Sequence, residues 1–258
     1  MYDLVRDRSG DDSVSFLDEE SRARHSTMWL IPRSTDDLAR RRRVHTLWAG
    51  PTFGLMGRAP DHVAGMLVAM VGASDVFAAS EHGHPGHLEA FYRRVRDDDL
   101  YMTYAIVPPQ VGRSKPAHAQ AEPFLSAGVA EERDDGVIVR GAQMIATSAV
   151  IADWLFVSHI PPLVEGDERY AISVVMPCSA PGLRIYPRRS HTDTASSVFD
   201  YPLSSRFDKT DSWGGAPTTS SCPRSMSSPT ATCRSRRRSS TRAARTRWPI
   251  SSRSCASR

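Results

Sequence analysis

The first hundred residues show the hydrophobic spacing of amphipathic helices. Five apolar residues recur at positions i, i+3, i+4, i+7 and i+8: Val63, Met66, Leu67, Met70 and Val71. This spacing places them on one face of a helix. The helix is predicted to open at Pro60, because proline suits the first helical position. A further helix with a charged outer face is predicted from about Leu88 to Asp99.

An earlier helix is predicted from the residues that favour its two ends. Ser34 is a suitable N-cap, and Asp36 and Asp37 follow in the first turn, where the helix dipole favours negative charge. The helix should end near Ala49, because Gly50-Pro51 stops it.

Short runs of β-forming residues follow Leu100, separated by Pro and Gly. The predicted strands cover residues 101–107, 128–132, 137–140, 154–160, 170–176 and 183–186. Asp135-Gly136 is typical of the turn in a hairpin between the second and third of these strands. Helices followed by strands indicate an α+β fold, with a helical domain packed beside a β-barrel or sandwich. We therefore expect a helical N-terminal domain over residues 1–100 and a β-barrel middle domain over residues 101–211.

Composition and charge indicate a cytoplasmic protein. The chain contains no run of 18 apolar residues, which argues against a membrane partner, and its start is charged and lacks an apolar signal core. The net charge of +4 is misleading, because residues 212–258 contain ten Arg and no Asp, Glu or Lys, so that residues 1–211 carry −6. Only Cys178 lies outside that last segment, which fits a reducing compartment.

The last segment, residues 212–258, is of a different kind. Ser and Thr make up 19 of its 47 residues, and it has no apolar periodicity. Such a segment buries too little apolar surface to offset the entropy of ordering. We expect a disordered Arg/Ser-rich tail. Nucleic-acid binding is the least favoured function of the chain, because Trp213 and Trp248 are the only aromatic residues of the tail.

Six segments, in order along the chain, carry a resemblance to a known family. They are LIPRSTDDLARRR (30–42), GLMGRAPDH (54–62), AIVPPQVGRSKP (105–116), GVIVRGAQMIATSAVIAD (136–153), APGLRIYPR (180–188) and FDYPLSSRFD (199–208). Together they resemble the large oxygenase component of two-component 4-hydroxyphenylacetate 3-monooxygenases, which are flavin-dependent aromatic hydroxylases. The resemblance covers the N-terminal and middle portions of that family.

The resemblance implies a fold related to acyl-CoA dehydrogenases, with an N-terminal helical domain, a middle β-barrel and a C-terminal helical bundle. It implies ortho-hydroxylation of a phenol similar to 4-hydroxyphenylacetate, in the catabolism of aromatic compounds, with O2 and FAD. The FAD would arrive as FADH2 from a separate flavin reductase and react through a C4a-hydroperoxide. The intact family forms homo-oligomers. The chain lacks the start of the helical domain and the bundle that covers the flavin, so we expect impaired flavin binding and activity.

Three residues match substrate positions of the family. Arg58 matches the arginine that holds the phenol oxygen, where a guanidinium stabilises a phenolate; alone, it would be a solvated loop arginine. His62 lies one turn later and matches a substrate-contacting position that is Tyr in some members. Tyr104 matches a position where some members carry a His that assists deprotonation. A phenol side chain is a poor base at neutral pH, so its catalytic role would be orientation, and packing in a strand is an equally good explanation.

Five residues match flavin-binding positions of the family. Four form a loop after the first predicted strand: Gln110, Val111, Gly112 and Arg113. Glycine permits close approach of the cofactor, and Arg113 can meet the pyrophosphate. Thr147 matches a threonine near the reactive edge of the isoalloxazine, although a threonine is also common in a strand.

Other patterns argue against competing functions. The segment from His82 to His87 lacks further ligands and is better explained as a solvated loop than as a metal site. Arg40 to Arg43 is typical of a solvated helix face. No Gly-x-Gly-x-x-Gly fingerprint is present, which fits a reductase on a separate chain. The alternatives are a non-catalytic remnant or interaction fragment of the same fold, and a flavoprotein of the acyl-CoA dehydrogenase type.

A change of reading frame would account for the composition of the tail. Residues 217–223 read Pro-Thr-Thr-Ser-Ser-Cys-Pro. The segment can be written in codons that, read in another frame, encode Asp-Asp-Val-Phe-Val-Pro, which members of the family carry at this point. We therefore hypothesise that residues after Asp211 are out of frame, through a frameshift or a sequencing error.

Overall fold

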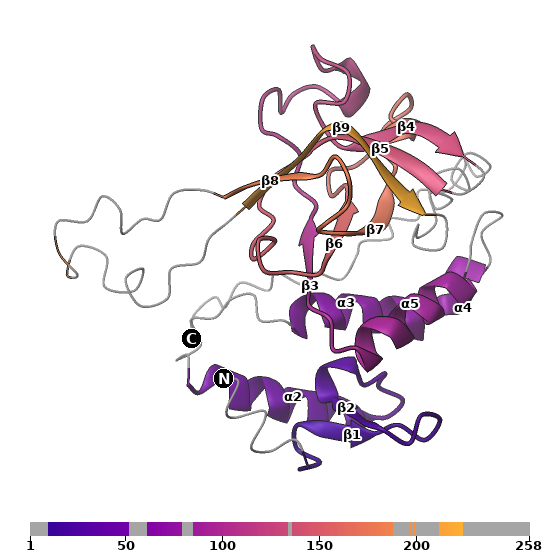
Figure 1. Cartoon of the computed structure of the whole chain (residues 1–258), viewed down its shortest axis with the longest axis vertical. Helices are drawn as coiled ribbons and strands as arrows, with labels where there is room; N and C mark the ends of the chain where they lie inside the picture. The colour runs from indigo at the N-terminus through magenta and orange to yellow at the C-terminus, as the bar shows by residue number, and fades with distance from the viewer. Residues whose placement is uncertain are drawn as a thin grey trace, which may run out of the picture.

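The computed structural model describes residues 10–51, 61–78, 85–133, 136–187, 197, 199 and 212–223. Helices lie on one side of the molecule and two β-sheets on the other (Figure 1). The smaller of the two sheets lies between the helices and the larger sheet, because one hydrophobic cluster covers each of its faces. The α+β fold class predicted from the sequence is confirmed.

The N-terminal part is not purely helical. Strands β1 (Ser15–Leu17) and β2 (Arg24–Ser26) pair antiparallel, and the 3-10 helix η1 (Thr27–Trp29) follows directly. The prediction of an all-helical segment over residues 1–100 is therefore wrong here. Three-residue strands are too short for an alternating hydrophobic pattern to reveal them.

Helix α2 (Thr35–Ala49) begins and ends where the sequence predicts. Ser34 is the N-cap, and its hydroxyl accepts a hydrogen bond from the Asp37 amide. The Asp37 carboxylate accepts one in return from the Ser34 amide, which completes a capping box. Gly50 is the C-cap.

Three further helices follow along the chain. They are α3 (Asp61–Gly72), α4 (Ser74–Ala78) and α5 (Pro85–Asp97). The predicted apolar face of α3 is confirmed, since Val63, Leu67 and Met70 are buried and Met66 and Val71 pack against the same cluster. Pro60, the predicted start, lies outside the described residues. Within the described part of the chain, no helix is both long and apolar enough to cross a bilayer.

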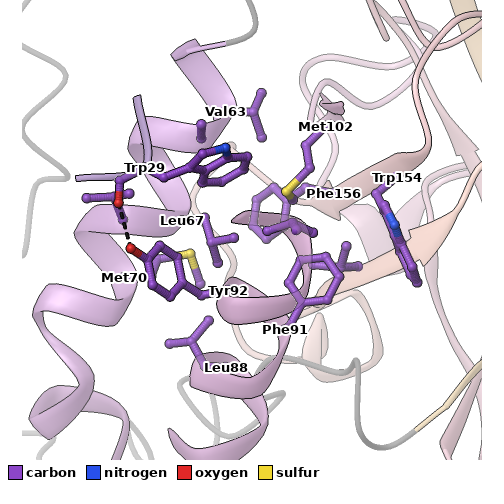
Figure 2. Close-up of a cluster of buried hydrophobic side chains, with 14 of the residues drawn as sticks. Trp29, Val63, Leu67, Met70, Leu88, Phe91, Tyr92, Met102, Trp154 and Phe156 are labelled. Atoms are coloured by element: carbon purple, nitrogen blue, oxygen red, sulfur yellow. Dashed lines mark hydrogen bonds between the residues drawn. The ribbon is translucent and has the colours of Figure 1, made fainter. Parts of the chain in front are cut away.

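The smaller sheet has the order β3 (Met102–Ala105), β6 (Trp154–Ser158), β7 (Ser173–Pro177), with β3 parallel to β6 and β7 antiparallel to it. Alternate side chains point to opposite faces of a strand. One face of this sheet packs on α3 and α5, and Figure 2 shows Met102, Trp154 and Phe156 beside the helix residues. Phe91 of α5 meets Trp154 edge to face, with ring centroids 5.1 Å apart.

The larger sheet has the order β4 (Gly128–Arg133), β5 (Gly136–Gln143), β9 (Ser212–Pro223), β8 (Arg184–Pro187), all antiparallel. The predicted β4–β5 hairpin is confirmed, but Gly136 pairs with Arg133 as the first residue of β5 instead of lying in the turn. Asp134 and Asp135 lie outside the described part. Val137 and Val139 pack against the second face of the smaller sheet. Among the described residues, the strands from β3 onward thus form two packed sheets and not the closed barrel expected from the sequence.

Strand β9 lies in the segment predicted to be disordered. Its backbone pairs with β5 from Gly136↔Pro223 to Gln143↔Gly214 and with β8 from Arg184↔Gly215 to Pro187↔Ser212. The prediction of disorder is therefore wrong for residues 212–223, because two neighbouring strands supply backbone hydrogen bonds that composition cannot reveal. The origin of the segment in another reading frame stays a prediction.

The arginine run on α2 is not a simple solvated face. The Arg40 side chain donates hydrogen bonds to the Asp12 and Ser15 carbonyls. One terminal nitrogen of Arg41 donates to the Thr27, Met28 and Leu30 carbonyls at 3.3, 2.8 and 2.8 Å. These contacts tie α2 to β1 and η1, so the sequence interpretation is wrong for these two residues.

Candidate functional site

Two of the residues predicted to contact substrate lie together. His62 is exposed in the first turn of α3, and Tyr104 is buried on β3. Their ring centroids are 5.5 Å apart with an interplanar angle of 46°. Tyr104 faces the helices because it alternates with Thr103 and shares its face with Met102. The pair therefore lies at the junction of the helical layer and the smaller sheet.

Side chains of α2 hold the first turn of α3 in place. The His45 Nε2 lies 2.9 Å from the Asp61 Oδ2, and Arg41 interacts electrostatically with the same carboxylate. Asp61 directly precedes His62, so these contacts position the turn that carries the imidazole. Arg58, the third predicted substrate residue, lies outside the described residues.

Two loops diverge from a single backbone bridge beyond β3. The Met144 amide donates a hydrogen bond to the Val107 carbonyl at 2.7 Å. The loop with Gln110 to Arg113 leaves this bridge on one side and the turn with Thr147 leaves it on the other. The segment with Thr147 runs back along β3, where the Thr147 carbonyl meets Thr103, whereas the loop with Gln110 to Arg113 continues beyond the strand's C-terminal end. Both predicted flavin-binding segments therefore adjoin β3.

The loop from Gln110 to Arg113 presents its side chains to solvent. Val111 is 75% exposed, and Arg113 is exposed without an ion-pair partner among the described residues. The Gln110 amide donates to the Pro108 carbonyl at 2.9 Å. A flexible cation beside exposed apolar surface and a glycine suits contact with a phosphorylated cofactor, so the donor set fits the pyrophosphate of FAD.

The turn with Thr147 is held tightly. The Thr103 hydroxyl donates to the Thr147 carbonyl at 2.5 Å, and Ile145 and Ser148 adopt positive φ values of 61° and 68°. Such backbone is costly for residues other than glycine and is often found at functional sites. Thr147 is only 5% exposed, so a ligand would reach its side chain at one edge only. Thr147 lies after β5 in this turn and not within a strand.

Metal binding receives no support. Among the residues that the structure describes, no three His, Cys, Asp or Glu side chains are grouped so that they could hold an ion. Residues 82–84 of the histidine-rich segment from His82 to His87 lie outside those residues. Burial raises the pKa of the Cys178 thiol to about 11, which keeps it protonated at neutral pH.

His159, which follows β6, predicts a pH effect on stability. Burial lowers the pKa of His159, and the nearby Asp167 opposes this shift. Because the unfolded chain binds the proton more readily, the free energy of unfolding should fall as the pH drops below about 6.5. Urea unfolding at pH 7.5 and pH 5.5 measures this loss. The H159Q variant should lose less than the wild type, and an equal loss in both proteins would contradict the assignment.

Comparison with protein families gives a clear match. Residues 1–213 match the family model described as the 4-hydroxyphenylacetate 3-hydroxylase N terminal. The chain belongs to this family. The 4-hydroxyphenylacetate 3-monooxygenase oxygenase component of Thermus thermophilus is 35% identical over 211 residues, which is 82% of this chain and 42% of the relative. The oxygenase component of a Rhodococcus 4-nitrophenol 2-monooxygenase is 34% identical and covers 69% of this chain and 34% of the relative.

Solved structures agree with the family match. The oxygenase component of 4-hydroxyphenylacetate 3-monooxygenase in complex with FAD and 4-hydroxyphenylacetate superposes with a TM-score of 0.77 at 33% identity. The match covers 88% of this chain and 46% of that protein. An archaeal 4-hydroxybutyryl-CoA dehydratase shares the fold, with a TM-score of 0.72 at 18% identity. This member of the 4-hydroxyphenylacetate 3-hydroxylase family therefore spans less than half the length of the relatives it matches.

The structure also reveals site residues that the sequence interpretation missed. His45 holds the turn that carries His62, and Gln120 and Asp167 bind the segment around Arg113. No motif contains these residues. Their contacts depend on how distant loops meet in space, which a single sequence does not reveal.

Proposed function

We propose that this chain forms the phenol- and flavin-binding portion of an oxygenase that uses FADH2 to hydroxylate a phenol ortho to its hydroxyl group. The contact between His62 and Tyr104, at the end of the strand that leads to the Arg113 loop, is the observation that carries the proposal. It supports the proposal because two groups able to bind a phenol oxygen are in contact, and one of them lies on the strand that continues into the segment proposed to bind the cofactor.

Reduced FAD, when bound, supplies the activation of O2. The chain's own contribution is to hold that cofactor: Arg113 would pair with the pyrophosphate, and the backbone of Gln110, Val111 and Gly112 would approach it closely. Thr147 would offer its hydroxyl near the reacting edge. Family membership supports these assignments, and the exposure of the loop makes it accessible to a ligand.

The phenol would lie against the helix side of β3. Arg58 would stabilise the phenolate, because a charge-assisted hydrogen bond favours the anion and the anionic ring is the better nucleophile. Tyr104 would orient the phenol oxygen, and His62 would accept or donate a hydrogen bond at the exposed side. A substrate related to 4-hydroxyphenylacetate fits this set of groups.

The proposed role as an FADH2-dependent oxygenase also implies partners and a location. A separate flavin reductase would supply FADH2, the working protein would be a homo-oligomer, and its location would be the cytoplasm. The open loop around Val111 admits water. Because water near an activated flavin diverts O2 to hydrogen peroxide, we expect low yields of hydroxylated product from this chain.

FAD titration followed by flavin fluorescence tests the proposal. Saturable binding is expected, and 4-hydroxyphenylacetate should bind to the FAD complex with reduced affinity in the Y104F and H62A variants. With a flavin reductase present, the wild type should form hydrogen peroxide in excess over the catechol product. Absence of saturable FAD binding would overturn the proposed function.

A further inference from the structure

The loop that carries Arg113 is held in shape by a side chain eight residues further along. The Gln120 Nε2 lies 2.8 Å from the Gly112 carbonyl, 2.9 Å from the Lys115 carbonyl and 3.5 Å from the Pro116 carbonyl. The Gln120 side-chain amide thus links backbone carbonyls at both ends of the segment from Gly112 to Pro116. The Lys115 amide also donates to the Gly112 carbonyl at 3.1 Å, which forms the turn that the amide group closes.

Gly112 leaves room for this amide. A Cβ at position 112 would lie 2.7 Å from the Gln120 Oε1, which is closer than real contacts allow. The backbone of Gly112 has no positive φ, so an alanine there is permitted by conformation and obstructed only by Gln120. The glycine is therefore matched to the glutamine that it faces.

A second contact anchors the far end of the same loop. Asp167 is 2% exposed and lies just before the 3-10 helix η3 (Glu168–Tyr170). Its Oδ1 accepts hydrogen bonds from the His118 amide at 2.8 Å and lies 2.9 Å from the His118 Nδ1, in the 3-10 helix η2 (Ala117–Ala119). The Val164 amide donates to its Oδ2 at 3.1 Å. Burial raises the pKa of Asp167, but these hydrogen bonds outweigh burial and lower it overall, so the carboxylate is charged at neutral pH.

We propose that Gln120 and Asp167 are positioning residues that hold residues 110–116 in the conformation that receives the FAD pyrophosphate. This inference rests on the proposed function for its ligand and on the contacts above for its mechanism. Preorganisation matters because a loop that is already ordered loses less entropy when the cofactor binds. Neither residue would touch the flavin.

Amide hydrogen exchange of the whole chain without cofactor tests the mechanism. In the Q120A variant the Lys115 amide should exchange about tenfold to a hundredfold faster, because the hydrogen bonds by which the Gln120 amide closes the loop are lost. The His118 amide should be unchanged in Q120A and accelerated in D167N. The Q120E variant keeps the size of the side chain but loses the donor, so it should behave like Q120A. Unchanged Lys115 exchange in Q120A would overturn the inference.

A double variant gives a sharper test. G112A should displace the Gln120 amide and accelerate Lys115 exchange, whereas the same substitution in the Q120A background should add nothing. If the effects of G112A and Q120A on Lys115 exchange are fully additive, Gly112 and Gln120 do not act as a pair. The exposed Glu122 provides a control in the same segment, and E122Q should leave the exchange of Lys115 unchanged.

FAD affinity links the mechanism to function. At an unchanged midpoint of global unfolding, Q120A should bind FAD about tenfold more weakly than the wild type. Accelerated loop exchange with unaltered FAD affinity would overturn the positioning role but leave the proposed function intact. A wild-type chain that binds no FAD would overturn the proposed function, while the exchange measurements would still decide whether Gln120 holds the loop.

Discussion

Replacement of Trp29 by alanine should reduce the free energy of unfolding by about 3–5 kcal/mol, which is typical for loss of a large buried aromatic side chain. Trp29, the last residue of η1, is 1% exposed and packs in the core with side chains of α3 and α5 (Figure 2). Its carbonyl accepts a hydrogen bond from the Tyr92 hydroxyl at 2.6 Å, and the two rings meet edge to face. The alanine would leave a cavity that the surrounding helices fill only in part.

Urea unfolding followed by circular dichroism measures this loss. Leu38 on α2 offers a matched control because it is apolar and 57% exposed, so L38A should change stability by less than about 0.5 kcal/mol. Equal destabilisation by W29A and L38A would show that the helical layer is not organised around Trp29.

Replacement of Arg113 by alanine should weaken FAD binding about tenfold to a hundredfold, which corresponds to loss of one or two charge-assisted hydrogen bonds. Arg113 is exposed and has no ion-pair partner among the described residues, so its loss should leave the unfolding midpoint unchanged. The effect should shrink at high ionic strength, because salt screens the attraction between the guanidinium and phosphate.

The control for this prediction is R43A. Arg43 is also exposed, lies on α2, and changes the net charge by the same amount. Fluorescence titration should give the same FAD affinity for R43A as for the wild type. Similar weakening in both variants would point to a general effect of charge and would contradict a pyrophosphate contact at Arg113.

The sequence predicted those elements whose stabilising residues lie within the element itself. The capping residues around Ser34 and the apolar spacing in α3 located two helices closely, because both signals lie within the helix itself. The roles of Arg40 and Arg41 were not predictable, since their carbonyl partners lie eleven to 28 residues away. Strand β9 was missed because its composition is polar and its pairing partners are distant in sequence.

The candidate site was predictable to a similar extent. Resemblance to the family pointed to His62, Tyr104 and the loop of Arg113, and the structure brings His62 and Tyr104 into contact. The supporting residues Gln120 and Asp167 were not predictable, because amide and carboxylate side chains carry no signal of which carbonyl or amide they will meet.

A crystal structure of this chain with FAD and 4-hydroxyphenylacetate would test most directly whether β3 and the two segments that adjoin it bind both molecules. The expected complex has the FAD pyrophosphate at Arg113, the isoalloxazine beside the turn that contains Thr147, and the phenol oxygen near His62 and Tyr104. FAD bound away from the Arg113 loop, or a phenol on the other face of β3, would contradict the proposed site.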